Sequence, residues 1–439
     1  MRRTGSNRTD TQGRCAIKSG SLSQWLEYIE AQHPQHAIEL GLDRVREVAA
    51  RMSLARPARH VVTVAGTNGK GSTVAFIEAI ARASDWRVGA YTSPHLLRYN
   101  ERVRIDGHDA DDAALAAAFD AVEAARRDTP LTYFEYGTLA ALWLFQREEL
   151  DLAILEVGLG GRLDAVNIVD ADVAVITTVD IDHTEWLGQD RESIGREKAG
   201  IARAWKPLVL GEDDPPSSVL RHAYAIGANA LRAGCDFFHQ PADAEHWQWR
   251  DASDTLVLPE PALRAPAQRA NAAAAIAALR ALPETLKPEA YAEGVKAAAL
   301  PGRLQRLDWN GVETVVDVGH NPQAARELAR WLETQPAGGR TFAVFAALAD
   351  KDVLGVVRAL EERIDRWYLA GLSVAGRSQE SSRLAQRLQG TAAAAGKFAQ
   401  TVAEALNQAR AVVGVGDRIL VFGSFHTVAE ALAELYSVI

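Results

Sequence analysis

Residues 61–80 read VVTVAGTNGKGSTVAFIEAI, and this stretch decides the fold. The β-branched run Val61–Val64 predicts a buried strand, and the apolar residues of Val74–Ile80 predict a helix. The glycine-rich loop between them is typical of a phosphate-binding loop, because glycines let backbone N–H groups curl around phosphate oxygens at a helix N-terminus. Lys70 would neutralise the β and γ phosphates, and Ser72 or Thr73 would offer a hydroxyl to Mg²⁺. We therefore expect an α/β domain that binds a nucleotide.

This loop departs from the strict G-x-x-x-x-G-K-[ST] pattern. Gly66 stands three rather than five residues before Gly69, and Gly71 follows the lysine. A glycine–lysine–glycine turn alone is usually structural. Here a strand, three glycines, a lysine and two hydroxyls coincide, which favours nucleotide phosphates as the ligand. The sequence contains no N-K-x-D guanine-specificity motif, so an ordinary GTPase is not indicated.

Short β-rich runs alternate with helical stretches on both sides of residue 300, as in βαβ units around a mostly parallel sheet. We predict an α/β protein with a flexible extension over residues 1–20, a P-loop domain over 21–299 and a Rossmann-like domain over 300–439. The boundary is placed at Leu300–Arg303, where proline and glycine interrupt the pattern. A capped amphipathic helix is expected from Ser21, and irregular antiparallel strands within Pro241–Pro266. The expected strands are Val61–Ala65, Arg87–Thr92, Leu152–Val157, Val173–Thr178, Pro207–Leu210, Val312–Val318, Thr341–Ala346, Arg366–Ala370 and Arg418–Gly423. The expected helices are Ser72–Ala83, Asp111–Arg126, Tyr136–Glu148, Glu192–Ala204, Arg269–Ala281, Pro288–Ala299, Pro322–Thr334, Lys351–Arg363, Thr401–Val412 and Phe425–Tyr436.

Composition narrows the class of protein. The 439 residues are 48% hydrophobic, and 48 Lys+Arg against 57 Asp+Glu give a net charge of −9. This balance argues against a protein that wraps nucleic acid with its whole surface. No apolar run is long enough to span a bilayer, and the first twenty residues lack the apolar core of a secretory signal. The two cysteines, Cys15 and Cys235, indicate neither a disulfide framework nor a zinc site. A cytoplasmic protein without membrane or nucleic-acid partners is expected.

Reactive side chains follow three of the predicted strands. Ser93, Glu156 and His183 should share the rim of the sheet with Lys70, because ligands gather at the carboxyl ends of parallel strands. Oxygen ligands suit Mg²⁺, and one imidazole is tolerable. Taken alone, Glu156 could be a strand-end carboxylate whose hydrogen bonds are made within the protein. Taken alone, His183 could be a structural histidine.

Two further segments could have either a structural role only or a role at the ligand site. Arg196 and Lys198 would be ordinary solvated charges on a helix, or would lie near the same rim. Thr132–Tyr136 would be a simple helix start, or Tyr133 and Phe134 would stack on a flat heterocycle while Glu135 accepts hydrogen bonds from its ring N–H groups.

Nine motifs in one order resemble the folylpolyglutamate synthases, and more narrowly the bacterial bifunctional dihydrofolate synthase/folylpolyglutamate synthases of the Mur ligase superfamily. The resemblance runs from about Ser21 to the C-terminus. The motifs are Ala65–Thr73, Thr92–Leu96, Tyr133–Gly137, Leu155–Asp164, Asp182–Thr184, Arg196–Gly200, Pro301–Arg303, Asp317–Pro322 and Gly423–His426.

The resemblance implies an ATP-dependent amide ligase that activates a carboxylate as an acyl phosphate and couples it to L-glutamate. Its substrates would be dihydropteroate and tetrahydrofolate with its polyglutamates, and the enzyme would be a monomer that uses ATP and Mg²⁺, with two metal ions expected. Lys70, Lys198 and His320 would be catalytic, and Lys198 matches a lysine that is carbamylated in the superfamily. Ser93, Glu156, His183 and carbamylated Lys198 would hold metal. ATP would be bound by Thr67, Asn68, Gly69, Lys70, Gly71, Ser72, Asn271, Arg303 and Asp317. Substrate would be bound by Ile38, Glu39, Leu40, Thr132, Tyr133, Phe134, Glu135, Leu163, Asp164, Ala165 and, less firmly, Ser424.

Three alternatives remain open at this point. The chain could be a monofunctional folylpolyglutamate synthase, or another Mur-type ligase that adds an amino acid to a peptidoglycan precursor. A P-loop switch or a non-catalytic ATP-binding protein would need the loop but not the Ser93, Glu156 and His183 cluster. Gly319 stands where alanine is commoner in the family, and Asn271 lies in an Arg–Ala–Asn rather than a Pro–Asn context.

The resemblance also predicts where the positively charged side chains lie and how the two domains move. A protein with net charge −9 that binds ATP and an anionic folate should concentrate its cations at the ligand cleft, and we expect Lys70, Arg162, Arg196 and Arg303 there. Because the expected ligands come from both domains, catalysis should require the domains to close around ATP.

Overall fold

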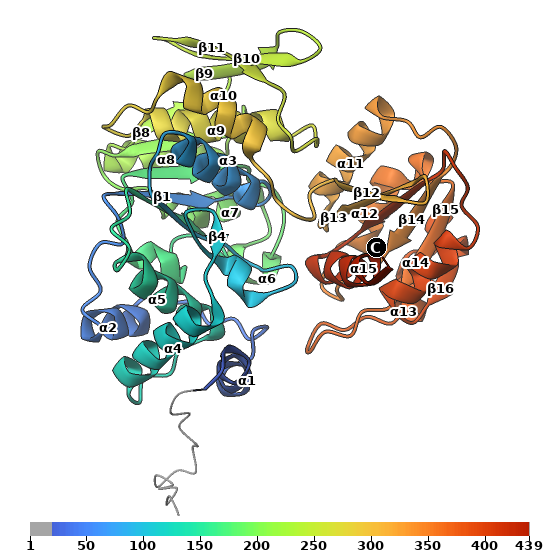
Figure 1. The fold of residues 1–439 in the computed structure, drawn as a ribbon, viewed down its shortest axis with the longest axis horizontal. Coiled ribbons are helices and arrows are strands. Elements are labelled where there is room, and N and C mark those ends of the chain that lie inside the picture. The colour runs from blue at the N-terminus through green and yellow to red at the C-terminus, as the bar shows by residue number, and fades with distance from the viewer. Residues whose placement is uncertain (1–19, 439) are drawn as a thin grey trace, which may run out of the picture.

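The computed structural model describes residues 20–438 and holds two sheet domains that lie side by side (Figure 1). The chain passes from the first domain to the second between Ala297, the last residue of helix α10, and Gln305, the first of strand β12. The expected flexible extension over residues 1–20, and Cys15 with it, falls almost wholly outside the described residues. None of the helices within residues 20–438 is long and apolar enough to cross a membrane.

The first domain is built on an eight-stranded sheet of order β4-β3-β2-β5-β1-β6-β7-β8. The six strands from β2 to β8 in that order run parallel, and β3 and β4 add an antiparallel edge. Every residue of β1 is buried, because helices cover both faces of the sheet. The predicted parallel sheet is confirmed, while the short strands β3, β4 and β8 were not predicted. The strands are β1 (His60–Ala65), β2 (Val88–Tyr91), β3 (Val103–Ile105), β4 (His108–Asp109), β5 (Leu152–Glu156), β6 (Val173–Ile176), β7 (Pro207–Leu210) and β8 (Asn229–Arg232).

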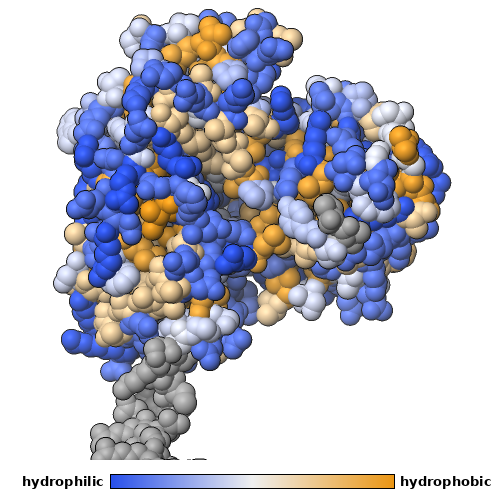
Figure 2. All heavy atoms as spheres, viewed as in Figure 1, coloured by the Kyte–Doolittle hydropathy of each residue, from blue (hydrophilic) through white to orange (hydrophobic). Residues whose placement is uncertain are grey.

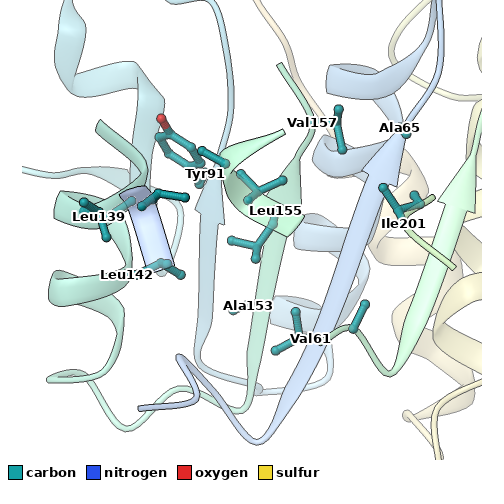
Figure 3. Packing of buried hydrophobic residues seen from close by; sticks show 14 of the residues in the cluster. Val61, Ala65, Tyr91, Leu139, Leu142, Ala153, Leu155, Val157 and Ile201 are labelled. Carbon is teal, nitrogen blue, oxygen red and sulfur yellow. The ribbon is translucent and has the colours of Figure 1, made fainter. Parts of the chain in front are cut away.

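One face of this sheet is covered by helices that form the first of its two hydrophobic cores. Leu139 and Leu142 of α5 pack toward Tyr91 and Leu155 of the strands (Figure 3). Helix α1 begins as predicted, with Ser21 and Gln24 forming a reciprocal capping box. The helices on this side are α1 (Leu22–Gln32), α2 (Asp43–Arg51), α4 (Asp112–Arg126), α5 (Tyr133–Phe145), α7 (Arg191–Ala199) and α8 (Ser217–Ile226), with the short α6 (Thr184–Leu187) at the rim.

The opposite face carries three helices and a small antiparallel sheet of order β11-β10-β9, seen at the top of Figure 1. Trp247 and Trp249 alternate along β10 and point into the core, where the indole N–H of Trp249 donates to the Ala273 carbonyl at 3.2 Å. The antiparallel strands predicted within Pro241–Pro266 are confirmed, although the first begins at Phe237. These elements are α3 (Lys70–Ala83), β9 (Phe237–Pro241), β10 (His246–Asp251), β11 (Thr255–Pro259), α9 (Gln268–Arg280) and α10 (Pro288–Ala297).

The second domain is a six-stranded sheet of order β12-β13-β17-β14-β15-β16, parallel except for β12. Helices lie on both faces and enclose two cores, which confirms the predicted second α/β domain. Its strands are β12 (Gln305–Trp309), β13 (Val312–Asp317), β14 (Thr341–Phe345), β15 (Arg366–Ala370), β16 (Lys397–Ala399) and β17 (Arg418–Phe422). Its helices are α11 (Pro322–Thr334), α12 (Val353–Leu360), α13 (Ser381–Arg387), α14 (Val402–Arg410) and α15 (Phe425–Val438).

Candidate active site in the interdomain cleft

A cavity of about 720 Å³ lies where the two domains meet, and it draws its wall from both. The surface is hollowed along this seam (Figure 2). The cavity brings together side chains from Gln35 to Phe425, which are 390 residues apart in the sequence. From the predicted site it is lined by Ile38, Glu39, Leu40, Thr67, Asn68, Gly69, Lys70, Gly71, Ser72, Ser93, Thr132, Tyr133, Phe134, Glu135, Glu156, Leu163, Asp164, Ala165, His183, Lys198, Asn271, Arg303, Asp317 and His320.

The glycine-rich loop joins β1 to α3 at one end of this cavity. Gly69 adopts a left-handed φ of 87°, and a Cβ there would collide with the side-chain oxygen of Asn271, so only glycine fits. Lys70 Nζ donates to the carbonyls of Gly66 at 3.1 Å and Thr67 at 3.4 Å, folding back over the loop. Burial lowers the pKa of Lys70, while the charge of Glu156 opposes that shift.

Asn68 of the same loop contacts the second domain directly. Its side-chain amide donates to Asn321 Oδ1 at 3.1 Å, and Asn321 Nδ2 donates back to Asn68 Oδ1 at 3.0 Å. Gln323 also accepts from Asn68. Asn321 caps helix α11 as well, accepting from the backbone N–H of Ala324 at 3.0 Å. The phosphate loop is therefore tied to the first turn of a helix in the other domain.

Arg303 and Asp317 also lie at the second domain's side of the cavity. Asp317 accepts the backbone N–H groups of Leu304 at 2.9 Å and Gly319 at 2.7 Å. Burial raises the pKa of Asp317, and the neighbouring Arg303 opposes the shift. At Gly319 a Cβ would come within 2.8 Å of Asp317 Oδ1, which gives a local reason for glycine at this position.

Two of the expected metal ligands are neighbours at the rim of the first sheet, and His183 lines the same cavity. The backbone N–H of Ser93 donates to Glu156 Oε2 at 3.2 Å, so the two predicted ligands are neighbours. Burial raises the pKa of Glu156, and Lys70 and the Ser93 N–H oppose it. Within residues 20–438 no three His, Cys, Asp or Glu side chains are grouped to enclose an ion. A carboxylate, a hydroxyl and an imidazole fit Mg²⁺, which completes its shell with phosphate oxygens and water.

Asp182 contacts three basic side chains. It lies in the Asp182–Thr184 motif but was not predicted as a site residue. Its carboxylate lies 2.7 Å from Lys351 Nζ, 3.5 Å from His320 Nε2 and 4.0 Å from His183 Nε2. Burial acts to raise the pKa of Asp182, but the hydrogen bond from His320 and the charge of Lys351 hold it well below its usual range. Two of these three partners come from the second domain, so Asp182 links the domains beside the predicted metal site.

Lys198 is buried in α7 and faces the cavity. Burial, and then the charge of Lys70, lower the pKa of the Lys198 ammonium to about 7, against the opposing charges of Asp182 and Glu212. Burial likewise raises the pKa of Glu212 to about 7. A large fraction of Lys198 is therefore a neutral amine at neutral pH.

Tyr133 and Phe134, the predicted aromatic residues of the substrate pocket, are the first two residues of α5 and line the cavity. Thr132 caps this helix, and Glu135 accepts the Thr132 N–H at 2.8 Å and Arg44 Nε at 2.8 Å. Glu135 is thus already bonded to a guanidinium from α2, a partner that the sequence analysis missed. The ring of Phe134 lies 5.8 Å from that of Tyr91, between centroids, and lines the cavity.

Asp164 lines the same cavity. It accepts the backbone N–H groups of Leu159 at 2.9 Å and Val166 at 3.1 Å. Burial raises the pKa of Asp164 to about 7, against the lowering effect of those hydrogen bonds. The acid therefore titrates near neutral pH.

Three expectations do not fit the cavity. Ser424 is not part of its wall; its hydroxyl accepts the backbone N–H of Thr427 at 3.0 Å in the first turn of α15. The prediction that Arg162 and Arg196 lie in the cleft is wrong, because neither lines the cavity. Arg162 instead pairs with Glu197 at 3.0 Å on the exposed side of α7, and Arg196 is exposed.

Comparison with known proteins agrees with this geometry. The family model of the Mur ligase middle domain matches residues 64–279, and that of the Mur ligase glutamate ligase domain matches residues 302–425. A dihydrofolate synthase/folylpolyglutamate synthase of Escherichia coli K12 is 47% identical over 412 residues, 94% of each chain.

Solved structures give the same result. The structure of E. coli FolC in complex with DHPP and ADP has a TM-score of 0.90 at 45% identity, over 95% of this chain and 98% of that one. A bifunctional folylpolyglutamate synthase/dihydrofolate synthase with Mn, AMPPNP and L-glutamate bound has a TM-score of 0.87 at 46% identity, over 95% and 98%. The chain therefore belongs to the Mur ligase family, within its dihydrofolate synthase/folylpolyglutamate synthase group.

Proposed function

We propose that this protein is an ATP- and divalent-metal-dependent ligase that joins L-glutamate to dihydropteroate and to the γ-carboxylate of reduced folates. The observation that carries the proposal is the single cavity in which the phosphate loop, the Ser93–Glu156 rim, the aromatic wall at Phe134 and the second domain's His320 meet. Relatives of this chain have been solved with ADP, AMPPNP, Mn and L-glutamate, and they carry the name of this activity.

The chemistry accounts for the assembly of side chains. A carboxylate resists attack because oxide is a poor leaving group. Its oxygen would attack the γ-phosphorus of ATP, the bond to ADP would break, and an acyl phosphate would form. The amine of glutamate would then attack the acyl carbon, an amide bond would form, and phosphate would leave. Lys70 would turn from its loop carbonyls onto the transferring phosphoryl group, whose charge it would stabilise.

Ser93, Glu156 and His183 would hold the metal. Mg²⁺ bound there would supply positive charge against the phosphate oxygens. The buried and partly desolvated carboxylate of Glu156 supports this role, because a cation would offset the cost of burying its charge.

We further propose that Lys198 is carbamylated and contributes to a second Mg²⁺ site. The neutral amine would attack carbon dioxide, form an N–C bond and release a proton to solvent, so that the side chain becomes an anionic oxygen ligand. The buried position of Lys198 on the cavity wall and its pKa near 7 support this assignment.

The decisive assay supplies the enzyme with ATP, Mg²⁺ and L-glutamate, and with dihydropteroate or tetrahydrofolate in parallel reactions. ADP with dihydrofolate in the first reaction, and ADP with a folate diglutamate in the second, is the expected result. Product from tetrahydrofolate alone would mean a monofunctional folylpolyglutamate synthase. Turnover of a uridine-linked muramyl substrate instead would mean a peptidoglycan ligase.

The remaining attributes expected from the resemblance are also proposals. We propose a cytoplasmic monomer that extends polyglutamate chains, and sedimentation, cell fractionation and product-length analysis would test the three properties.

A further inference from the structure

Arg102 is a buried arginine without an acidic partner. It ends the 3₁₀ turn Tyr99–Arg102 between β2 and β3, and only 2% of its surface is exposed. Its Nε donates to His95 Nδ1 at 2.8 Å, and no carboxylate within residues 20–438 lies within ion-pair distance. Its Nη2 is buried and has no hydrogen-bond partner in the described part of the chain. Burying a guanidinium in this state is costly unless an anion joins it.

Of the other three arginines that are buried within residues 20–438, Arg126 and Arg418 have a carboxylate partner, as has the partly buried Arg104, whereas Arg410 has none and does not line the cavity. Arg104, two residues away, pairs with Glu78 at 2.5 Å, Arg126 pairs with Glu123 at 2.6 Å, and Arg418 pairs with Glu313 at 2.6 Å. The lack of a carboxylate partner is therefore shared with Arg410, and the position of Arg102 on the cavity wall is what distinguishes it.

The position of Arg102 indicates where its anion would come from. Arg102 lines the interdomain cavity, and its guanidinium carbon lies 5.6 Å from the ring centroid of Tyr133, on the predicted substrate wall. Ser93 and Pro94, which also line the cavity, connect this wall to Glu156 at the metal rim. Arg102 thus lies between the aromatic pocket and the place where phosphoryl transfer would occur.

His95 fixes the orientation of the arginine. Arg102 Nε donates to His95 Nδ1 at 2.8 Å, and because a guanidinium has no acceptor, Nδ1 must be the ring nitrogen without a proton. With Nε occupied, the two terminal nitrogens remain for a ligand; neither has a hydrogen-bond partner in the described residues, and Nη1 is the one that is not fully buried.

The other two arginines of the cavity wall have roles or partners already, and Arg330 pairs with Glu327 of its own helix. Arg303 lies beside Asp317 in the second domain, where the family resemblance predicts a nucleotide contact. Of the three substrates that the proposed function brings to the cavity, the nucleotide has Lys70 and Arg303. Arg102 lies beside Tyr133, on the wall predicted to bind the pteroyl substrate, which favours that substrate's carboxylate over those of L-glutamate.

We propose that Arg102 binds the reacting carboxylate of dihydropteroate through its terminal guanidinium nitrogens. The inference rests on the proposed function and adds a binding residue to it. The guanidinium would hold one carboxylate oxygen on the pocket wall while the other faces the phosphate loop, so that it aligns the nucleophile without taking part in bond making.

The test uses the full-length Arg102→Gln and Arg102→Lys proteins. Arg98→Gln is the matched control, because Arg98 lies in the same loop, has a side chain that is 66% exposed and is absent from the cavity wall. Calorimetry would compare dihydropteroate, its carboxamide analogue, 6-hydroxymethyl-dihydropterin and ADP as ligands. In Arg102→Gln the Kd for dihydropteroate should rise about tenfold to hundredfold, the range expected for one charged hydrogen-bond partner. The Kd for ADP and for the carboxylate-free pterin should not change.

Two results would overturn the inference: an unchanged Kd for dihydropteroate, or an equal loss of affinity for the pterin without a carboxylate. If Arg102→Gln fails to fold, Arg102→Lys decides the question. The wild type should prefer the acid over the carboxamide, Arg102→Lys should reduce that preference, and an undiminished preference would reject the proposal. Failure of the wild type to form dihydrofolate would reject the proposed function instead, so the two failures can be told apart.

Discussion

Lys351 Nζ lies 2.7 Å from Asp182 Oδ1, and this ion pair spans the two domains. The side chains are only 7% and 12% exposed, so the pair is nearly dry. Lys351 follows β14 and Asp182 follows β6, and the carboxylate of Asp182 also lies near His183 and His320. An interdomain contact at the active site means that the chemistry and the domain arrangement are coupled.

Asp182→Asn should loosen the domain arrangement more than it unfolds either domain. The change leaves the Lys351 ammonium buried without its counter-ion, a loss of about 3 kcal/mol for a pair of this kind. Small-angle scattering should show a larger radius of gyration for the variant without substrates, and kcat should fall. Arg326→Gln, which removes the more exposed pair with Asp180, is the control and should change the scattering little. Identical scattering of Asp182→Asn and wild type would refute the coupling.

Glu156→Gln should separate nucleotide binding from turnover. The amide keeps the size of the side chain and its acceptor for the Ser93 N–H, but it loses the anionic ligand for Mg²⁺. We expect kcat to fall at least about a hundredfold while ADP binds with nearly wild-type affinity. Full activity of this variant would mean that the metal is held elsewhere.

Local pattern predicted much of the fold. The buried strands around Val61–Val64 and the capping box at Ser21 were recognised because each is specified by adjacent residues. Strands β3 and β4 were missed because they are only 3 and 2 residues long, too short to show a period.

The site was predicted where a motif identifies the residue and missed where tertiary contact alone creates the role. Lys70 and Glu156 follow strands in recognisable segments. Arg44 and Lys351 do not, because what makes them notable is a partner 91 or 169 residues away. Arg162 was wrongly expected in the cleft for the related reason that a charged residue in a motif can still point to solvent.

Lys198→Ala should lose most activity if the lysine carries a carbamate. Short carboxylic acids such as acetate should restore part of the activity, since they return an anionic oxygen to the emptied space. Arg196→Ala, on the exposed side of the same helix, should remain active and should not respond to acetate. The same activity in Lys198→Ala and wild type, or a loss that no carboxylate relieves, would argue against the carbamate.

Asp164→Asn should flatten the dependence of stability on pH. Burial raises the pKa of Asp164 to about 7 from the ordinary 3.8 of an aspartate, so between these values the folded chain holds a proton that the unfolded chain has lost. The free energy of unfolding must then fall as pH rises through this window, by at most about 4 kcal/mol, and the loss is complete above pH 7. The asparagine cannot ionise, so urea unfolding at pH 5 and pH 8 should show a smaller difference for the variant than for wild type. Asp112→Asn, at an exposed aspartate, should keep the wild-type difference. Equal differences in all three proteins would show that Asp164 ionises in the folded state as it does in the unfolded chain, and that its two backbone hydrogen bonds offset its burial.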